Sequence, residues 1–227
     1  NIERCGVRNA VVSAALPERL TPALTGLFDA VLTDAPCSGE GMFRREPAAL
    51  AQWSPALIAA CARRQAGILD EAAAMTAPGG RLLYSTCTFA PEENELQIAR
   101  FLLAHPEFEL ADLGDTLSFG RPGFSGERLL PFADPADWPH GTAALAALPL
   151  TRTRRILPGE AAGEGHFLAL LRRVGGARPA PPAHDYGRPG AAEREFDALY
   201  RACFRGAAPY GIARAVHDNH VPGRPWS

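Results

Sequence analysis

Two short segments of the chain hold the residue types that could do chemistry. Residues 34–41 (DAPCSGEG) place a carboxylate, Asp34, close to a thiol, Cys37, and residues 85–89 (STCTF) hold a second thiol, Cys87. We call these stretches the Cys37 segment and the Cys87 segment. An ionised thiol is a strong nucleophile and can form a covalent bond with a substrate. The sequence therefore predicts two thiols and one carboxylate gathered at a single site.

Local sequence around each thiol favours this interpretation. Pro36 fixes its own φ and keeps the preceding residue extended, so Asp34 and Cys37 are held in one rigid turn. A helix expected to begin near Pro91 would lower the pKa of the Cys87 thiol through its N-terminus. Taken singly, however, a cysteine after a buried strand is more often a small core residue than a nucleophile. Only the pairing of the two segments favours chemistry over packing.

The elements that must position these thiols are two strands and the helix between them. Residues 28–33 (FDAVLT) and 81–84 (RLLY) are short apolar runs typical of buried parallel strands. Residues 56–75 carry apolar side chains at helical spacing after Ser54, an N-cap residue. Strand, helix and strand predict a right-handed parallel crossover, which brings both thiols to the carboxyl ends of neighbouring strands. Ligands bind at that edge in open α/β sheets.

The rest of the chain completes an α/β fold. We expect a Rossmann-like sheet, incomplete at its N-terminal side, that ends in an antiparallel hairpin at the sheet edge. Residues 1–174 form the domain in this interpretation, and residues 175–227 are a linker followed by a truncated or divergent accessory segment. The further elements expected are a strand (9–13), helices (from 17, 91–104 and 193–204), and the two hairpin strands (153–157 and 166–173).

Composition narrows the class of protein. The formal net charge is −2, so the chain is not strongly basic as many nucleic-acid-binding domains are. Five cysteines without a C-x-x-C pair argue against a disulfide framework and against a closed zinc site. No stretch is long and apolar enough to cross a bilayer. These features predict a cytoplasmic monomer that holds no metal.

At the level of motifs, the chain resembles the NOP/Sun family of RNA cytosine-5 methyltransferases, in particular its bacterial ribosomal-RNA branch of the RsmF type. The resemblance implies a class I methyltransferase domain that uses S-adenosylmethionine. The Gly-rich loop and the ribose-binding acid of that fold have no counterpart in this sequence. The resemblance rests on residues 34–45 (DAPCSGEGMFRR) with 53–54, on 85–95 (STCTFAPEENE), and more weakly on 1–9 and 163–167.

The resemblance also implies roles for the site residues. Cys87 adds to carbon 6 of cytosine, which activates carbon 5 for methylation. Asp34 hydrogen-bonds the ring on the side of nitrogen 3 and the exocyclic amine, and Cys37 assists the elimination that frees the product. Asp34 and Pro36 also lie beside the cofactor. DNA cytosine-5 methyltransferases use the Pro-Cys thiol instead, so Cys37 as the nucleophile is the mechanistic alternative.

The expected partner is RNA, in particular small-subunit ribosomal RNA. Arg44 and Arg45 follow the Cys37 segment, and Arg152, Arg154 and Arg155 cluster on the predicted hairpin, where guanidinium groups could contact phosphates. The plainer interpretation is that these arginines form a solvated surface. A different function also stays open, namely a non-catalytic RNA-binding or ribosome-assembly module that keeps the fold without the cofactor loop.

Overall fold

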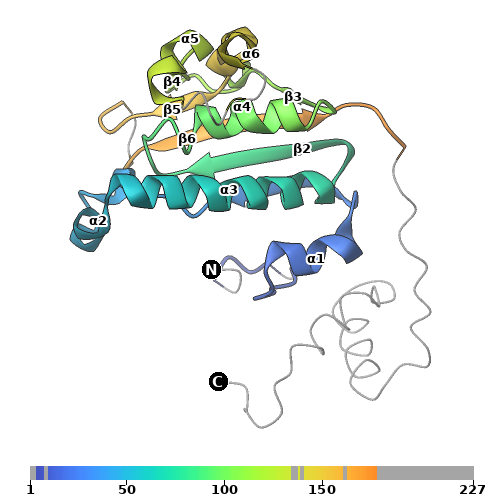
Figure 1. Ribbon diagram of the computed structural model, residues 1–227. Coiled ribbons are helices and arrows are strands. Elements are labelled where there is room, and N and C mark those ends of the chain that lie inside the picture. The colour runs from blue at the N-terminus through green and yellow to red at the C-terminus, as the bar shows by residue number, and fades with distance from the viewer. Residues whose placement is uncertain (1–3, 8–9, 134–137, 139–140, 161–162, 178–227) are drawn as a thin grey trace. The chain divides into compact units, whose positions relative to one another are not determined.

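The computed structural model describes residues 4–7, 10–133, 138, 141–160 and 163–177 (Figure 1). Contacts divide the chain into two compact units, one formed by Asn1–Leu16 with Pro182–Ser227 and the other by Pro17–Pro181. In the first unit, residues 10–16 form neither helix nor strand. Residues 10–13 therefore do not form the strand expected over 9–13. An apolar run becomes a strand only where another strand satisfies its backbone groups. The expected helix over 193–204 lies outside the described residues.

The larger unit is a mixed α/β domain, as expected. Its helices are α1 (Pro17–Leu24), α2 (Pro47–Gln52), α3 (Pro55–Met75), α4 (Glu95–Ala104), α5 (Gly126–Leu129) and α6 (Gly141–Ala147), with short 3-10 turns η1 (Glu40–Met42), η2 (Leu113–Asp115), η3 (Leu130–Phe132) and η5 (Leu150–Arg152). Its strands are β1 (Phe28–Asp34), β2 (Thr76–Thr86), β3 (Phe108–Leu110), β4 (Arg121–Pro122), β5 (Arg154–Ile156) and β6 (His166–Arg173). Within the described residues, no helix combines the length and apolar character that crossing a bilayer requires.

One six-stranded sheet organises this unit. Its strands follow the order β1-β2-β6-β5-β4, with β3 also paired to β6. β1 and β2 are parallel, as predicted, with α3 between them in the chain, and Asp34 lies opposite Ser85 at their carboxyl ends. The predicted hairpin is the antiparallel pair β5 and β6. β6 is not at the edge, however, because it pairs with β2 on its other side, and β4 lies beyond β5.

Helix α3 begins as the sequence predicts, because Ser54 caps it through a 3.1 Å hydrogen bond from the Leu57 N–H and Pro55 occupies its first turn. It ends at Met75, and β2 starts at the next residue. Residues 78–80 (PGG) therefore do not end the helix. They lie in the irregular start of β2, where the pairing with β1 shifts register, as Pro and Gly commonly do in strands.

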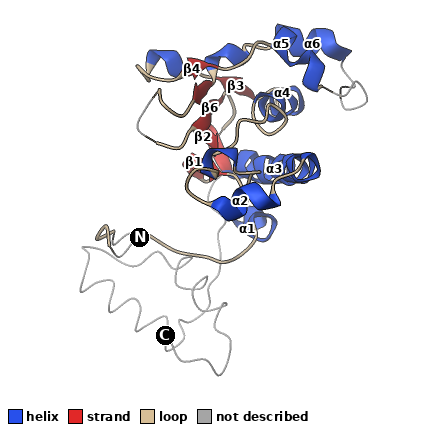
Figure 2. Ribbon diagram, turned by 90° about the vertical axis from the view of Figure 1, so that its left-hand side faces the viewer, coloured by secondary structure: helices blue, strands red, loops and turns tan. Residues whose placement is uncertain are grey.

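Helices α3 and α4 cover one face of the sheet and pack against each other (Figure 2). The core between them and the strands is built from large side chains that are almost fully buried, among them Leu69, Leu82, Tyr84, Phe167 and Leu171. The side chain of Leu32 on β1 is instead 68% exposed. The sheet is therefore strongly buried on the face that α3 and α4 cover.

Helix α4 begins at Glu95, four residues later than the start expected at Pro91. The sequence pattern assigns the acidic residues after Pro91 to the first helical turn, where they would suit the positive end of the helix dipole. In the structure they form a turn whose polar side chains are buried: Glu93, Asn94 and Glu95 are each 0% exposed. These side chains bond neighbouring loops, and those bonds replace the first helical turn.

Candidate functional site

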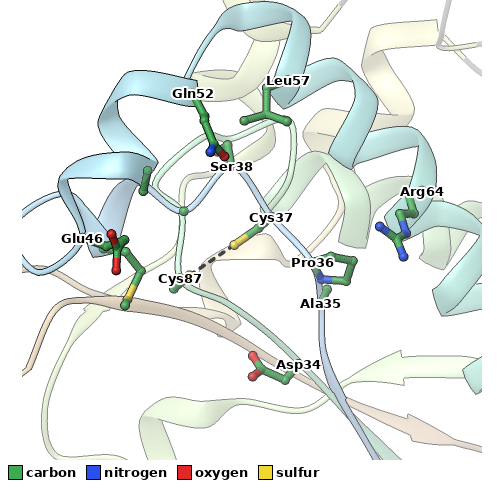
Figure 3. A pocket seen from close by; sticks show the side chains of 13 residues that line it. Asp34, Ala35, Pro36, Cys37, Ser38, Glu46, Gln52, Leu57, Arg64 and Cys87 are labelled. Atoms are coloured by element: carbon green, nitrogen blue, oxygen red, sulfur yellow. Dashed lines mark hydrogen bonds between the residues drawn. The ribbon is translucent and has the colours of Figure 1, made fainter. Parts of the chain in front are cut away.

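The register of β1 and β2 brings the Cys37 segment and the Cys87 segment together. The Ala35 N–H continues the strand ladder by donating to the Ser85 carbonyl over 2.9 Å. The Ser85 hydroxyl donates to Asp34 Oδ1 over 3.0 Å. Just beyond, the sulfur atoms of Cys37 and Cys87 lie 3.3 Å apart (Figure 3). The two thiols and the carboxylate thus meet at the carboxyl ends of two parallel strands.

These groups line a cavity of about 730 Å³ at the sheet edge. Its size falls in the range of small-molecule sites, and thiols, carboxylates and one guanidinium share its wall with apolar side chains. The lining consists of Asp34, Ala35, Pro36, Cys37, Ser38, Gly39, Met42, Glu46, Ala49, Gln52, Leu57, Arg64 and Cys87. Pro36, expected beside the cofactor, is therefore in the same wall as the two thiols.

The two sulfur atoms are within hydrogen-bond distance, so ionisation of one is coupled to the other. The hydrogen bond from the Cys37 thiol, aided by the Cys87 backbone N–H, lowers the pKa of Cys87 to about 7, although burial and the charges of Asp34 and Glu93 oppose that shift. The same hydrogen bond, with burial and the negative charge on Cys87, raises the pKa of Cys37 above its usual range. Cys87 is therefore the sulfur that ionises first, near neutral pH.

The Glu40 side chain connects the Cys37 segment to the Cys87 segment through hydrogen bonds. Its Oε2 accepts hydrogen bonds from the Phe89 N–H (2.8 Å) and the Thr88 hydroxyl (3.2 Å). Its Oε1 accepts from the Trp53 indole over 3.0 Å. One carboxylate thereby fixes the Cys37 segment to the Cys87 segment and to the residue before the Ser54 cap. The sequence motif contains Glu40, but nothing in its local pattern shows that its side chain turns toward residues 88 and 89.

A close backbone contact adds to this connection. The Gly41 N–H donates to the Cys87 carbonyl over 2.7 Å. A Cβ at residue 41 would lie 2.7 Å from that carbonyl oxygen and 3.1 Å from the backbone oxygens of Glu164 and Gly165, so only glycine fits. Gly39 supplies the left-handed turn, with φ of +73°, that leads the chain from Ser38 into this contact.

Glu93 supports the Cys37 turn from the protein interior. Its Oε2 accepts from the Ser38 N–H (3.0 Å) and from the Gln65 side-chain amide (2.7 Å). The same Gln65 amide donates to the Pro36 carbonyl over 3.0 Å. Burial raises the pKa of Glu93, and the hydrogen bonds from Ser38 and Gln65 act against that rise. The sequence pattern did not predict a role for Glu93 or Gln65. The one signal available was the polar Gln65 on the apolar face of the helix, which is typical of a buried polar pair.

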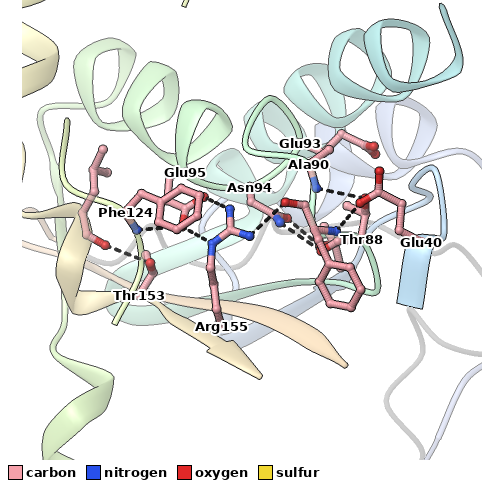
Figure 4. A network of polar contacts seen from close by, with 12 residues as sticks. Glu40, Thr88, Ala90, Glu93, Asn94, Glu95, Phe124, Thr153 and Arg155 are labelled. Atoms are coloured by element: carbon pink, nitrogen blue, oxygen red, sulfur yellow. Dashed lines mark hydrogen bonds and ion pairs between the residues drawn. The ribbon is translucent and has the colours of Figure 1, made fainter. Parts of the chain in front are cut away.

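The arginines of the hairpin are placed differently from the expectation. Arg155 is 5% exposed and therefore is not part of a solvated surface. It forms an ion pair with buried Glu95, and its guanidinium also donates to the Phe89 carbonyl over 2.9 Å (Figure 4). Glu95 additionally accepts from the Phe124 N–H over 2.9 Å. Arg155 is thus a structural residue that reaches the end of the Cys87 segment.

The five arginines expected to contact RNA all lie outside the cavity wall. Arg44 has a side chain 64% exposed and pairs with Glu164 at 3.2 Å. Arg45 is exposed. Arg154 has a side chain only 12% exposed, 3.9 Å from Asp112, so a phosphate contact there would require its guanidinium to turn outward. In the described part of the chain, no cluster of three or more His, Cys, Asp or Glu side chains could hold a metal ion.

Comparison with known proteins shows which family the chain belongs to. Residues 1–172 match the family described as 16S rRNA methyltransferase RsmB/F. The chain is 36% identical to ribosomal RNA small subunit methyltransferase F of Cronobacter sakazakii over 82% of its own length and 34% of the relative's. It is also 36% identical to the protein of the same name from Serratia proteamaculans, over 83% and 35% of the two lengths. It therefore spans about a third of these relatives.

A solved structure shows the same fold. A methyltransferase homologue from Pyrococcus horikoshii superposes with a TM-score of 0.56 and 27% identity, covering 76% of this chain and 48% of that one. The matched family region contains both thiol segments and every strand of the sheet except the last residue of β6. The resemblance inferred from the two motifs is thus confirmed. The chain belongs to the RsmB/F family of 16S rRNA methyltransferases.

Proposed function

We propose that this chain carries the catalytic thiols of an enzyme that methylates carbon 5 of a cytosine in ribosomal RNA, through a covalent bond to Cys87. The observation that carries the proposal is the 3.3 Å approach of the Cys37 and Cys87 sulfurs beside Asp34, which makes Cys87 the ionised thiol. Membership of the RsmB/F family supports ribosomal RNA as the substrate. S-adenosylmethionine supplies an electrophilic methyl group, and Asp34 and Pro36 in the cavity wall would lie beside it.

The chemistry begins with the addition of a thiolate to an electron-poor ring. The Cys87 sulfur forms a bond to carbon 6, and the electron pair of the C5=C6 double bond moves toward carbon 5 and nitrogen 3. Asp34 would lie on the side of nitrogen 3 and the exocyclic amine, where its carboxylate accepts a hydrogen bond from the amine and a proton held between Asp34 and nitrogen 3 neutralises the negative charge that builds up there. Its carboxylate is held for this by the Ser85 hydroxyl. Carbon 5 would then bond the methyl group as the bond between that methyl group and the sulfonium sulfur of S-adenosylmethionine breaks.

Release of the product needs a base close to carbon 5, and Cys37 is placed for that role. Negative charge on Cys87 is one of the causes that raise the pKa of Cys37. Once Cys87 is bonded to carbon 6, that charge is gone and the pKa of Cys37 falls. Cys37 can then release its own proton to solvent, and the resulting thiolate takes the proton from carbon 5. The freed electron pair restores the double bond, the sulfur–carbon 6 bond breaks, and the Cys87 thiolate returns.

The test is methylation of small-subunit ribosomal RNA by this protein, together with any residues that its gene encodes before Asn1. Nucleosides are analysed by mass spectrometry for 5-methylcytosine. Cys87→Ala should abolish methylation and the covalent RNA adduct, whereas Cys37→Ala should abolish turnover while the adduct accumulates. The reverse pattern would assign the nucleophile to Cys37. RNA binding without methylation by the wild type would favour a non-catalytic module instead.

A further inference from the structure

Arg64, on helix α3, is the one guanidinium in the cavity wall among the described residues. The residue is exposed. Within the described part of the chain, no carboxylate forms an ion pair with it. Figure 3 shows its side chain beside Pro36, on the opposite side of the cavity from Glu46. A cation that lines the same cavity as both thiols is therefore available to a ligand.

The position of Arg64 is set by its neighbour. Gln65 is 0% exposed and donates to both the Pro36 carbonyl (3.0 Å) and Glu93 (2.7 Å). These bonds fix the rotation of α3 against the turn that holds Cys37. Adjacent residues of a helix point about 100° apart, so the same bonds present Arg64 at the rim of the cavity. Arg63, the preceding residue, is also exposed but does not line the cavity.

The cavity wall is rich in negative groups, so an anionic ligand such as RNA needs a nearby cation to bind there. Asp34, Glu46 and the Cys87 thiolate make the wall negative, which repels the phosphates on either side of a target cytidine. A guanidinium offers paired donors that match a phosphate and stays charged at every physiological pH. Held at the rim, it can neutralise one phosphate while the base enters the cavity.

We propose that Arg64 binds a backbone phosphate of the RNA next to the target cytosine, and so positions that base over Cys87. This inference rests on the proposed function and adds a phosphate contact to it. The carboxylate of the methionine part of S-adenosylmethionine is an anion of similar shape. The exposed rim position favours the phosphate, and the experiment separates the two ligands.

The experiment measures binding of a cytosine-containing single-stranded RNA oligonucleotide to the full chain by fluorescence anisotropy over a series of salt concentrations. Arg64→Ala should weaken binding up to about fivefold, as loss of an exposed ionic contact does. It should also make the slope of log affinity against log salt shallower by about 0.7, the value for one phosphate contact on a single strand. Arg64→Lys should keep the slope, and Arg63→Ala should change neither quantity.

Calorimetric titration of S-adenosylmethionine into the same variants provides the second arm. Weaker binding of S-adenosylmethionine by Arg64→Ala, with RNA binding unchanged, would assign Arg64 to the carboxylate and overturn the phosphate contact. An unchanged salt slope, an equal effect of Arg63→Ala, or no RNA binding by the wild-type chain would overturn it as well.

The Cys87 adduct separates this inference from the proposed function. If the wild type forms the adduct and Arg64→Ala leaves the salt slope unchanged, only the phosphate contact fails. If the salt slope falls as expected and no adduct or 5-methylcytosine appears, only the proposed chemistry fails.

Discussion

At the scale of single residues, the chemistry of the site depends on which of two sulfur atoms keeps a shared proton. A hydrogen bond between thiols 3.3 Å apart stabilises a thiolate on one of them and a neutral thiol on the other. Cys37 is the more deeply buried of the pair, and its pKa is raised, whereas that of Cys87 is lowered to about 7. In the proposed reaction, the nucleophile is therefore activated by another cysteine rather than by a histidine.

The pH dependence of alkylation tests this assignment. Cys87 is an acid with a lowered pKa, so its reactive form is present above about pH 7 and is lost as the pH falls through that value. The rate of Cys87 modification by iodoacetamide, followed by peptide mass spectrometry, should reach half its maximum near pH 7. In Cys37→Ala that midpoint should move upward, because the hydrogen bond that lowers the pKa is removed.

Cys61 serves as the internal control in the same samples. Burial raises the pKa of its thiol, so its modification should have a midpoint above 9, the ordinary value for a cysteine. A Cys87 midpoint that coincides with that of Cys61, or one that does not move in Cys37→Ala, would show that the two sulfurs do not share a proton.

At the scale of elements, the sequence predicts the parallel strands and the helix between them but not the contacts behind the site. Apolar runs and the Ser54 cap are local signals, so β1 and α3 could be read from them. The contacts of Glu40 with Phe89 and of Glu93 with Ser38 join segments 49 and 55 residues apart in sequence, and no local pattern encodes them. The late start of α4 was missed for the same reason.

Gly41 provides a test of how closely the two segments must approach. In Gly41→Ala the new Cβ would meet three backbone oxygens, at 2.7, 3.1 and 3.1 Å, and none of them can rotate away as a side chain would. The Cys87 carbonyl must then shift, which should lower the free energy of unfolding by about 1–3 kcal/mol and reduce adduct formation. Urea denaturation and the adduct assay measure these two effects.

Gly67 is the matched control for that substitution. It lies within α3, and a Cβ placed there meets no heavy atom within 4 Å. Gly67→Ala should raise the free energy of unfolding by about 0.5–1 kcal/mol, because alanine favours a helix over glycine, and should leave adduct formation unchanged. If both alanine variants behave alike, close approach of the backbones is not what positions Cys87.

At the scale of the whole molecule, the buried ion pair between Glu95 and Arg155 connects the helical layer to the far strands of the sheet. Glu95 opens α4 and Arg155 lies in β5, and their side chains are 0% and 6% exposed. The Arg155 guanidinium also lies 4.1 Å from the centre of the Phe124 ring and donates to the Phe89 carbonyl. One buried arginine thus links β5, the irregular stretch around residue 124 and the end of the Cys87 segment.

Removal of one partner should leave the other charge buried without its counter-ion. Arg155→Met is therefore expected to lower the free energy of unfolding by about 3–5 kcal/mol in urea denaturation. Glu164→Gln, which breaks the exposed pair with Arg44, should change the free energy of unfolding by less than about 1 kcal/mol.

The double variant Glu95→Leu with Arg155→Met should recover part of the stability lost in Arg155→Met, because no isolated charge remains. It should not recover all of it, because the Phe124 N–H and the Phe89 carbonyl lose their partners. Equal losses from the buried and the exposed substitutions would mean that solvent reaches the Glu95 pair and that β5 is held by apolar packing alone.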